Sequence, residues 1–567
     1  MRALGAWGSA GRRALAGASL GAGLPRYATL LPPPGALARQ REGDGFSAVS
    51  PVPLAASLLG QLRELPPGDV LAVLKSLVDA FSPSGQAHLD AAAPAKSEQS
   101  FAREASKRLF EEAVVLADHP EGWVTALRFD ELWYIPHICV LGRRTDTQVP
   151  SINHARRLMG ATDRAVRAHV DSPTKLAALR QATSAPVSIS NLCVWTMQAG
   201  KLGALSSTNA HRLWGTLAAA ALGVGVGAFR TRELCKMLHA YTRAQALLGG
   251  GPDPLSELGG IPTNSPMRTR PGRALADHPD RTQWLVERAK ADGRRCRQLM
   301  LALYGELAER APSLTGTELS RVAWSIGVSG LPAQPLLRAL ARALPAATPS
   351  LSAAEACTCL WALCCRGYYP RDVIAALVAP LNALDAVAVR ELFVLQASSR
   401  ARRVQLSAID LALRHEGPLA LRPTPELSPH LLGLGEGMAA GASKFSAGMV
   451  PGASSDLHLQ VSALLSEMST AHENEPTIAS LGCVVDVLLT DSPVVLEIFG
   501  PTHYAFGGTE ITGSSALKLR LLRLEGWLVV ELPYYEWNAL LSVQARREYL
   551  AGKIAGNTDR ALDASVP

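Results

Sequence analysis

The sequence predicts a mainly α-helical protein: an α-solenoid of helical-hairpin repeats followed by a small C-terminal α/β domain. Apolar residues recur at three- and four-residue spacing over most of the chain, which is typical of helices that bury one face. One helical-hairpin segment recurs 37 residues further on. Beyond residue 453 the pattern changes to short runs of Val, Leu and Ile, which are typical of strands.

The chain has 567 residues, more than one hydrophobic core usually serves, so we expect two or three folded units. Hydrophobic residues make up 48% of it, charged residues 19% and aromatic residues only 5%. These values favour a helical protein rich in Ala and Leu over an aromatic-rich β-sandwich.

Residues 1–41 contain arginine but no lysine and no acid, and they include a Pro-rich turn at 32–34. This composition is typical of a mitochondrial transit peptide. We therefore expect residues 1–41 to be removed on import into the mitochondrial matrix; a chloroplast transit peptide and a disordered terminus are the alternatives. The arginines are Arg2, Arg12, Arg13, Arg26, Arg39 and Arg41.

The remaining charge is almost balanced, because removing these six arginines lowers the formal charge from +7 to about +1. The bulk charge of residues 42–567 is therefore no evidence for a nucleic-acid partner. Residues 42–100, rich in Pro, Gly, Ser and Ala, indicate a flexible leader.

Residues 101–422 are predicted to be the helical repeat region. Each repeat has a first helix with a central Trp, a Gly turn and a second apolar helix, and such a unit must be covered by stacked neighbours. The result is a solenoid with an extended concave surface, and we expect its two Trp side chains to be buried at equivalent positions. In the repeat, Glu318, Trp324, Gly330 and Leu336 recur as Glu355, Trp361, Gly367 and Val373.

The helical region lacks the pattern of a metal site or a membrane span. No Cys/His pair at zinc-knuckle spacing follows the four cysteines between 357 and 365. The longest uncharged run, 213–229, is too short to cross a bilayer and is broken by glycines. We expect no membrane span, and the nine cysteines, an odd number, indicate buried thiols in a reducing compartment.

A basic loop insertion near 250–280 interrupts the repeats, and its basic character continues into Arg294, Arg295 and Arg297. These side chains could contact phosphates, or they could simply be solvated. Both interpretations stay open.

A Gly/Ser/Pro-rich linker at 423–453 precedes a C-terminal domain predicted at 454–556, with a tail at 557–567. An amphipathic helix at 454–469 begins this domain. Strand-like runs follow at 483–489, 493–500 and 526–533, and a helix that ends at Gly526 lies between the last two.

Several motifs of this domain together resemble the RAP domain, which is named as an RNA-binding domain abundant in apicomplexans. They are VVDVLL, LEIFGPTHY, SSALKLRLLRLEGW, VVELPYYEWNAL and REYL, over roughly 480–555. RAP domains typically follow helical repeats of the FAST-kinase-like, octotricopeptide or heptatricopeptide type, and the 37-residue period is similar to the last. The resemblance implies a protein that binds organellar rRNA or mRNA and acts in RNA processing, stability or translation. A non-catalytic component of the organellar ribosome, with ribosomal proteins as partners, is the alternative.

The RAP domain in turn resembles restriction-endonuclease-like nucleases. That resemblance implies that Asp486 and Glu497 occupy the positions of two metal-binding carboxylates. The lysine expected two residues after the glutamate is Phe499 here, so Lys518 alone could supply the missing cation. We therefore expect no catalysis and no cofactor. The alternatives are a Mg²⁺-dependent endoribonuclease that uses Asp486, Glu497 and Lys518, and a purely structural pair.

Aromatic and basic side chains of this domain are candidate RNA contacts, because aromatic rings can stack on unpaired bases. The same rings could fill the core. The seven basic and ten acidic residues of 484–567 argue that the domain does not hold phosphates unaided. The candidates are Phe499, His503, Tyr504, Lys518, Arg520 and Tyr534, with Tyr535 as an alternative to Tyr534.

Overall fold

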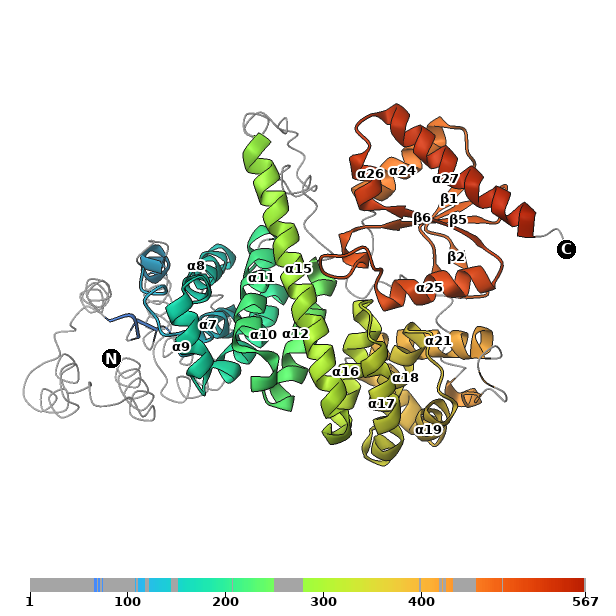
Figure 1. The fold of residues 1–567 in the computed structure, drawn as a ribbon. Helices are drawn as coiled ribbons and strands as arrows, with labels where there is room; N and C mark the ends of the chain where they lie inside the picture. Colours follow the sequence, from blue (N-terminus) through green and yellow to red (C-terminus); the bar gives the residue numbers. More distant parts are fainter. Residues whose placement is uncertain are drawn as a thin grey trace, which may run out of the picture. The chain divides into compact units, whose positions relative to one another are not determined.

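The computed structural model describes residues 122–143, 151–205, 207–248, 279–396, 399–417, 425–431, 455–481 and 483–564, with residue 421 and a few positions between 66 and 117 (Figure 1). The predicted transit peptide, most of the leader, the basic loop up to residue 278 and most of the second linker lie outside the described residues. The chain forms two compact units, Met1–Asn209 and Ala210–Pro567.

The first unit is helical. Its helix α7 packs against α8 and α10, and Ser151 and Ser172 cap the amino ends of α8 and α9 by accepting backbone N–H groups. Trp195 of α10 lies 4.2 Å from the ring of His137 on α7. The elements are η2 (Phe129–Glu131), α7 (Tyr134–Arg143), α8 (Ile152–Val170), α9 (Pro173–Gln181) and α10 (Ala185–Lys201).

The helices of the second unit form two layers, which confirms the predicted solenoid. The first-helix layer consists of α12 (Thr231–Leu248), α16 (Gly316–Ser329), α18 (Ala353–Cys365) and α21 (Ser399–His415), each packed on the next. The second-helix layer consists of α15 (Pro279–Arg310), α17 (Gln334–Ala347) and α19 (Arg371–Asn382). The remaining elements are α11 (Ser207–Val224), η3 (Val226–Ala228), η4 (Ala311–Ser313), η5 (Thr348–Ser350), α20 (Ala386–Arg390) and the π-helical turn η6 (Glu391–Leu395).

The 37-residue repeat has a local cause at the start of each first helix. Thr315 caps α16 and Ser352 caps α18 through a hydroxyl that accepts the N–H of the residue three positions on. The side chains of Glu318 and Glu355 reach back and accept the N–H of the capping residue. Each reciprocal pair satisfies two backbone donors that a helix terminus otherwise leaves unpaired.

The repeat also fixes the end of each first helix, but it does not bury both tryptophans. Gly330 and Gly367 adopt φ values of 74° and 58°, a left-handed conformation that favours glycine. Trp361 is 8% exposed, because Gly327 of the neighbouring helix leaves room for its ring. The expected burial of Trp324 is wrong: its ring is half-exposed, beneath the guanidinium of Arg243.

The C-terminal domain is a four-stranded mixed sheet with helices on both faces (Figure 1). The strand order is β1-β4-β5-β6, in which β5 and β6 are parallel and the other pairs antiparallel. Helix α25 makes the crossover from β5 to β6 and lies on the face opposite α24 and α27. The elements are α24 (Asp456–Glu467), β1 (His472–Asn474), β2 (Thr477–Ile478), β3 (Cys483–Val484), β4 (Val487–Leu489), β5 (Val494–Phe499), η7 (Pro501–His503), α25 (Gly513–Leu524), β6 (Leu528–Pro533), α26 (Tyr534–Ala539) and α27 (Val543–Ala564).

The core of this domain lies between the sheet and the pair α24 and α27. Val461 and Leu465 of α24 pack there with Leu496 of β5, Val530 of β6 and Trp537 of α26, each at most 1% exposed. On the opposite face, α25 packs against α16, α18 and α21. Both faces of the sheet are therefore covered, and every residue of β5 is buried.

All nine cysteines are buried free thiols, four of them in α18. Burial raises the pKa of Cys357 and Cys359 to about 12, so these thiols stay protonated and inert at neutral pH. Among the described residues, no single helix combines the length and apolar composition needed to cross a membrane. The helices Arg371–Asn382 and Ala386–Leu395 meet those criteria only as a pair, and the pair is bent by 98°.

Candidate functional site

The three residues of the predicted nuclease-like site lie together under α25. Glu497 of β5 is 2% exposed, and Lys518 of α25 places its Nζ 2.6 Å from one carboxylate oxygen and 2.7 Å from the other. Asp486, which precedes β4, accepts the N–H of Ile498 at 2.7 Å. Burial raises the pKa of Glu497 to about 7, although the charge of Lys518 lowers it.

This arrangement does not fit a magnesium ion. Mg²⁺ requires oxygen ligands in near-octahedral geometry, usually carboxylates with open coordination positions. Here the ammonium of Lys518 stands against both oxygens of Glu497, and one oxygen of Asp486 accepts a backbone amide. Among the described residues, no group of three His, Cys, Asp or Glu side chains could hold a metal ion. The geometry is that of a buried ion pair.

The aromatic candidates beside this pair are mostly internal. Phe499 is 1% and Tyr504 2% exposed, and Phe499 stacks on His503 with ring centroids 5.2 Å apart. His503 bonds through Nδ1 to the hydroxyl of Ser515, and burial lowers its pKa. The expectation that Phe499 and Tyr504 could stack on RNA is corrected, because α25 and the first-helix layer cover this face of the sheet.

The tyrosines at the end of β6 reach the surface from this cluster, and His503 is partly exposed. Tyr534 is half-buried and Tyr535 is 39% exposed. Their rings lie 5.8 Å and 5.5 Å from that of Tyr504. Of the aromatic candidates, these two tyrosines and His503 therefore have solvent access.

Two of the predicted basic contacts instead hold the C-terminal domain to the helices of the second unit. Arg520 of α25 donates to Glu416 at 2.6 Å and to the carbonyl oxygens of Cys364 and Cys365 at 2.6 Å and 3.2 Å. These carbonyls end α18, where a helix carries partial negative charge. Arg297 of α15 pairs with Glu510, with one N–O distance of 2.6 Å.

Close backbone contacts reinforce this attachment. A Cβ at Gly330 would lie 2.1 Å from the carbonyl oxygen of Ile511, and one at Gly513 would lie 1.9 Å from that of Gly327. Both positions accept only glycine without a shift of the backbone. The C-terminal domain is thus docked on the carboxyl ends of α16 and α18.

Of the three remaining basic candidates, Lys518 pairs with Glu497 inside the domain, and the other two lie on α15. Arg295 pairs with Asp292 at 3.0 Å, whereas Arg294 is exposed. Because Arg297 is engaged in docking, Arg294 and Arg295 are the predicted basic candidates of α15 that are exposed.

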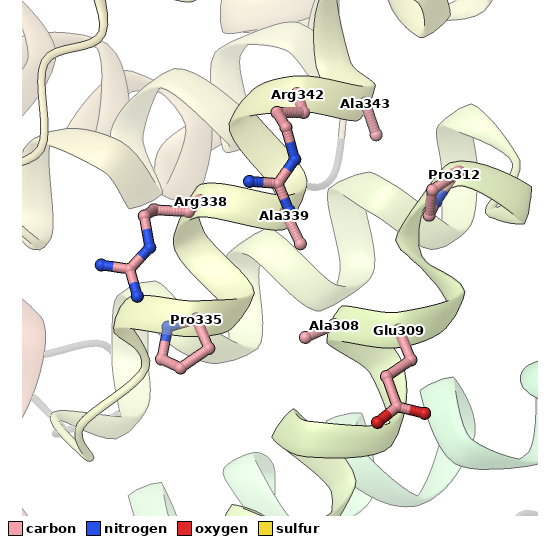
Figure 2. Close-up of a pocket in the computed structure, with 8 residues that line it drawn as sticks. All are labelled: Ala308, Glu309, Pro312, Pro335, Arg338, Ala339, Arg342 and Ala343. Atoms are coloured by element: carbon pink, nitrogen blue, oxygen red, sulfur yellow. The ribbon is translucent and has the colours of Figure 1, made fainter.

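Sequence reasoning missed two arginines on the second-helix layer. Arg338 and Arg342 of α17 line two adjoining hollows of about 520 Å³ and 420 Å³, between α17 and its neighbours α15 and α19. Figure 2 shows both side chains projecting from α17, while Glu309 projects from α15. The i, i+4 spacing of Arg338 and Arg342 could have revealed a shared face in the sequence. The pair was overlooked because most other residues of α17 are apolar.

Comparisons with known proteins identify the C-terminal domain. The RAP domain family matches residues 496–553, from β5 into α27. A chloroplastic RAP domain-containing protein of Oryza sativa subsp. japonica is 34% identical over 82 residues. This match covers 14% of the present chain and 13% of the relative, so it concerns one domain of each protein. The chain therefore carries a RAP domain, as its motifs predicted, preceded by helical repeats.

Proposed function

We propose that the protein binds RNA in an organelle, most simply the mitochondrial matrix, and acts in RNA processing, stability or translation without cleaving RNA. The observation that carries this proposal is the RAP domain at residues 496–553. Its attachment to the first-helix layer supports a joint function for the domain and the solenoid.

The organellar part of the proposal rests on two independent features. Residues 1–41 contain six arginines and no acid, as expected for a sequence imported along a membrane potential. The rice relative is a chloroplastic protein. A plastid location is the alternative, and mapping the amino terminus of the protein from purified organelles distinguishes import from retention of Met1.

The state of the carboxylates supports the proposal that the protein does not cleave RNA. Removal of one preorganised electrostatic contact typically slows an enzyme about 100- to 1000-fold. Here the only lysine of the cluster formed by Asp486, Glu497 and Lys518 is tied to Glu497. A metal-dependent nuclease remains the second candidate, because these three side chains do lie together.

Binding of single-stranded RNA by the purified protein, residues 42–567, tests the proposal. We expect a mixed-sequence 20-nucleotide RNA to bind with an affinity that falls as salt rises, and to remain intact in Mg²⁺. Lack of binding at low salt would contradict RNA recognition. Cleavage abolished by both Asp486→Ala and Glu497→Ala would establish the nuclease instead, and stoichiometric co-sedimentation with a ribosomal subunit would favour a ribosomal component.

A further inference from the structure

Helix α12 exposes one narrow stripe, and cationic side chains dominate it. From Thr231 to Ala246 the partly or fully exposed residues after the first turn follow helical spacing, at positions 236, 239, 243 and 246. Arg232 begins the same stripe, which continues through Lys236, His239 and Arg243. The rest of the helix between these positions is buried.

The neighbouring helix α16 continues this surface. Its Arg321 and Trp324 are half-exposed and stand at the places that Lys236 and His239 hold on α12, counted from the capping glutamate of each helix. The ring of Trp324 lies 4.9 Å from that of His239, and the guanidinium carbon of Arg243 lies 4.2 Å from the Trp324 centroid. We call these six residues, four on α12 and two on α16, the basic stripe.

The acids of these helices do not neutralise the basic stripe. Glu233, the single acid of α12, caps its own helix and pairs with Arg230. Glu318, the single acid of α16, is bonded to Thr315. Among the described residues, no carboxylate lies within ion-pair distance of Arg232, Lys236, Arg243 or Arg321.

The charges of the stripe also act on one another. The pKa of Lys236 is lowered by burial and further by the positive charges of Arg232 and Arg321, although Glu233 raises it. A bound anion would relieve this repulsion. The geometry thus offers spaced cations beside one partly exposed indole ring.

We infer that the basic stripe binds single-stranded RNA, with Arg232, Lys236 and Arg321 on phosphates and a base stacked against Trp324. This inference rests on the proposed RNA binding and assigns it to a surface outside the RAP domain. An unpaired strand presents both phosphates and free base faces, whereas a base-paired duplex hides the faces that a ring could cover. Arg243 contributes by packing its guanidinium over the indole and by adding positive charge.

Two sets of variants of the 42–567 protein separate the two kinds of contact. Lys236→Gln with Arg321→Gln should weaken binding of both a 20-nucleotide oligouridine and inorganic polyphosphate. The slope of log affinity against log salt should decrease by about 1.4, or about 0.7 for each lost contact with a single strand. Trp324→Ala should weaken oligouridine binding by about 5-fold or more and leave polyphosphate binding unchanged, while Trp324→Phe retains most of the affinity.

The matched control is Arg338→Gln with Arg342→Gln, which removes the same charge from the second-helix layer. This control should bind oligouridine like the parent, and melting curves verify that each variant is folded. If the control loses affinity and the stripe variants do not, RNA binding stands and the inferred surface is wrong. Equal loss of polyglutamate and RNA binding in Trp324→Ala would show a surface for acidic protein segments, which also overturns the inference. If the parent binds no RNA, the proposed function itself fails.

Discussion

At the scale of single residues, several charged and aromatic side chains that were predicted to contact RNA have structural roles instead. The charged side chains are neutralised by partners inside the protein. Lys518 and Glu497 satisfy each other inside the RAP domain, and Arg520 satisfies Glu416 and the end of α18. A buried ion pair stabilises little compared with an apolar core, but removing one partner leaves the other charge unpaired.

At about pH 8, above the pKa of Glu497, replacing Glu497 by Gln should therefore destabilise the protein by about 3 kcal/mol, because the buried ammonium of Lys518 loses its counter-charge. The matched control is Glu531→Gln, which lies opposite Glu497 on β6 and pairs with Arg523 at the surface. That change should cost about 1 kcal/mol or less. Equal losses in urea denaturation of the two variants would contradict the burial of the pair.

The pKa of Glu497 also predicts how stability depends on pH. Burial raises it to about 7 in the folded protein, above the value of about 4.3 for an exposed glutamate. Between these values the folded state holds a proton that the unfolded state lacks, so stability falls as pH rises from about 5 to 7. Denaturation of the parent and Glu497→Gln at both pH values tests this: the variant should lose this part of the pH dependence, and an identical profile would contradict it.

Phe499→Ala should lower stability by about 3 to 5 kcal/mol, because it empties a core site beside His503. The folded variant should retain its RNA affinity. A selective loss of affinity, with an unchanged melting temperature, would show that Phe499 does reach RNA.

At the scale of elements, local signals predicted the repeats well. The recurring Glu318 and Glu355 mark capping boxes, and Gly330 and Gly367 mark left-handed turns, so 37-residue spacing follows from requirements of helix ends. The exposure of individual side chains was less predictable from the sequence. The half-buried state of Trp324 depends on the particular neighbour that α12 presents, which no period within the sequence reveals.

Contacts between distant elements carried no local signal at all. Arg520 and Glu416 are 104 residues apart, and their pairing removes a predicted RNA contact. The basic stripe did have a signal in the sequence, because Arg232, Lys236 and Arg243 outnumber Glu233, the single acid of α12. Which of these side chains reach solvent depends on the neighbouring helices, and the sequence pattern does not show that.

The docking of the RAP domain can be tested at Gly513. An alanine there would place its Cβ 1.9 Å from the carbonyl oxygen of Gly327, so α25 should shift away from α16. We expect faster amide exchange along α25 and a loss of stability. Gly500→Ala is the control, because no described atom lies within 4 Å of its added Cβ. Unchanged exchange in Gly513→Ala would contradict the close packing.

At the scale of the whole molecule, the solenoid and the RAP domain have different roles. The solenoid of the second unit presents the cationic surface, and the RAP domain closes the carboxyl ends of its first helices. Residues 484–567, which include the RAP domain, carry seven basic and ten acidic residues, and the buried pair is neutralised. We therefore assign phosphate contacts to the solenoid.

Ultraviolet crosslinking of the 42–567 protein to a single-stranded RNA, followed by mass spectrometry of the joined peptides, tests this assignment most directly. The account predicts crosslinks at Trp324 and in the peptide that contains Lys236 to Arg243, with intact RNA in the presence of Mg²⁺. Crosslinks confined to the RAP domain, or magnesium-dependent cleavage of the RNA, would contradict it.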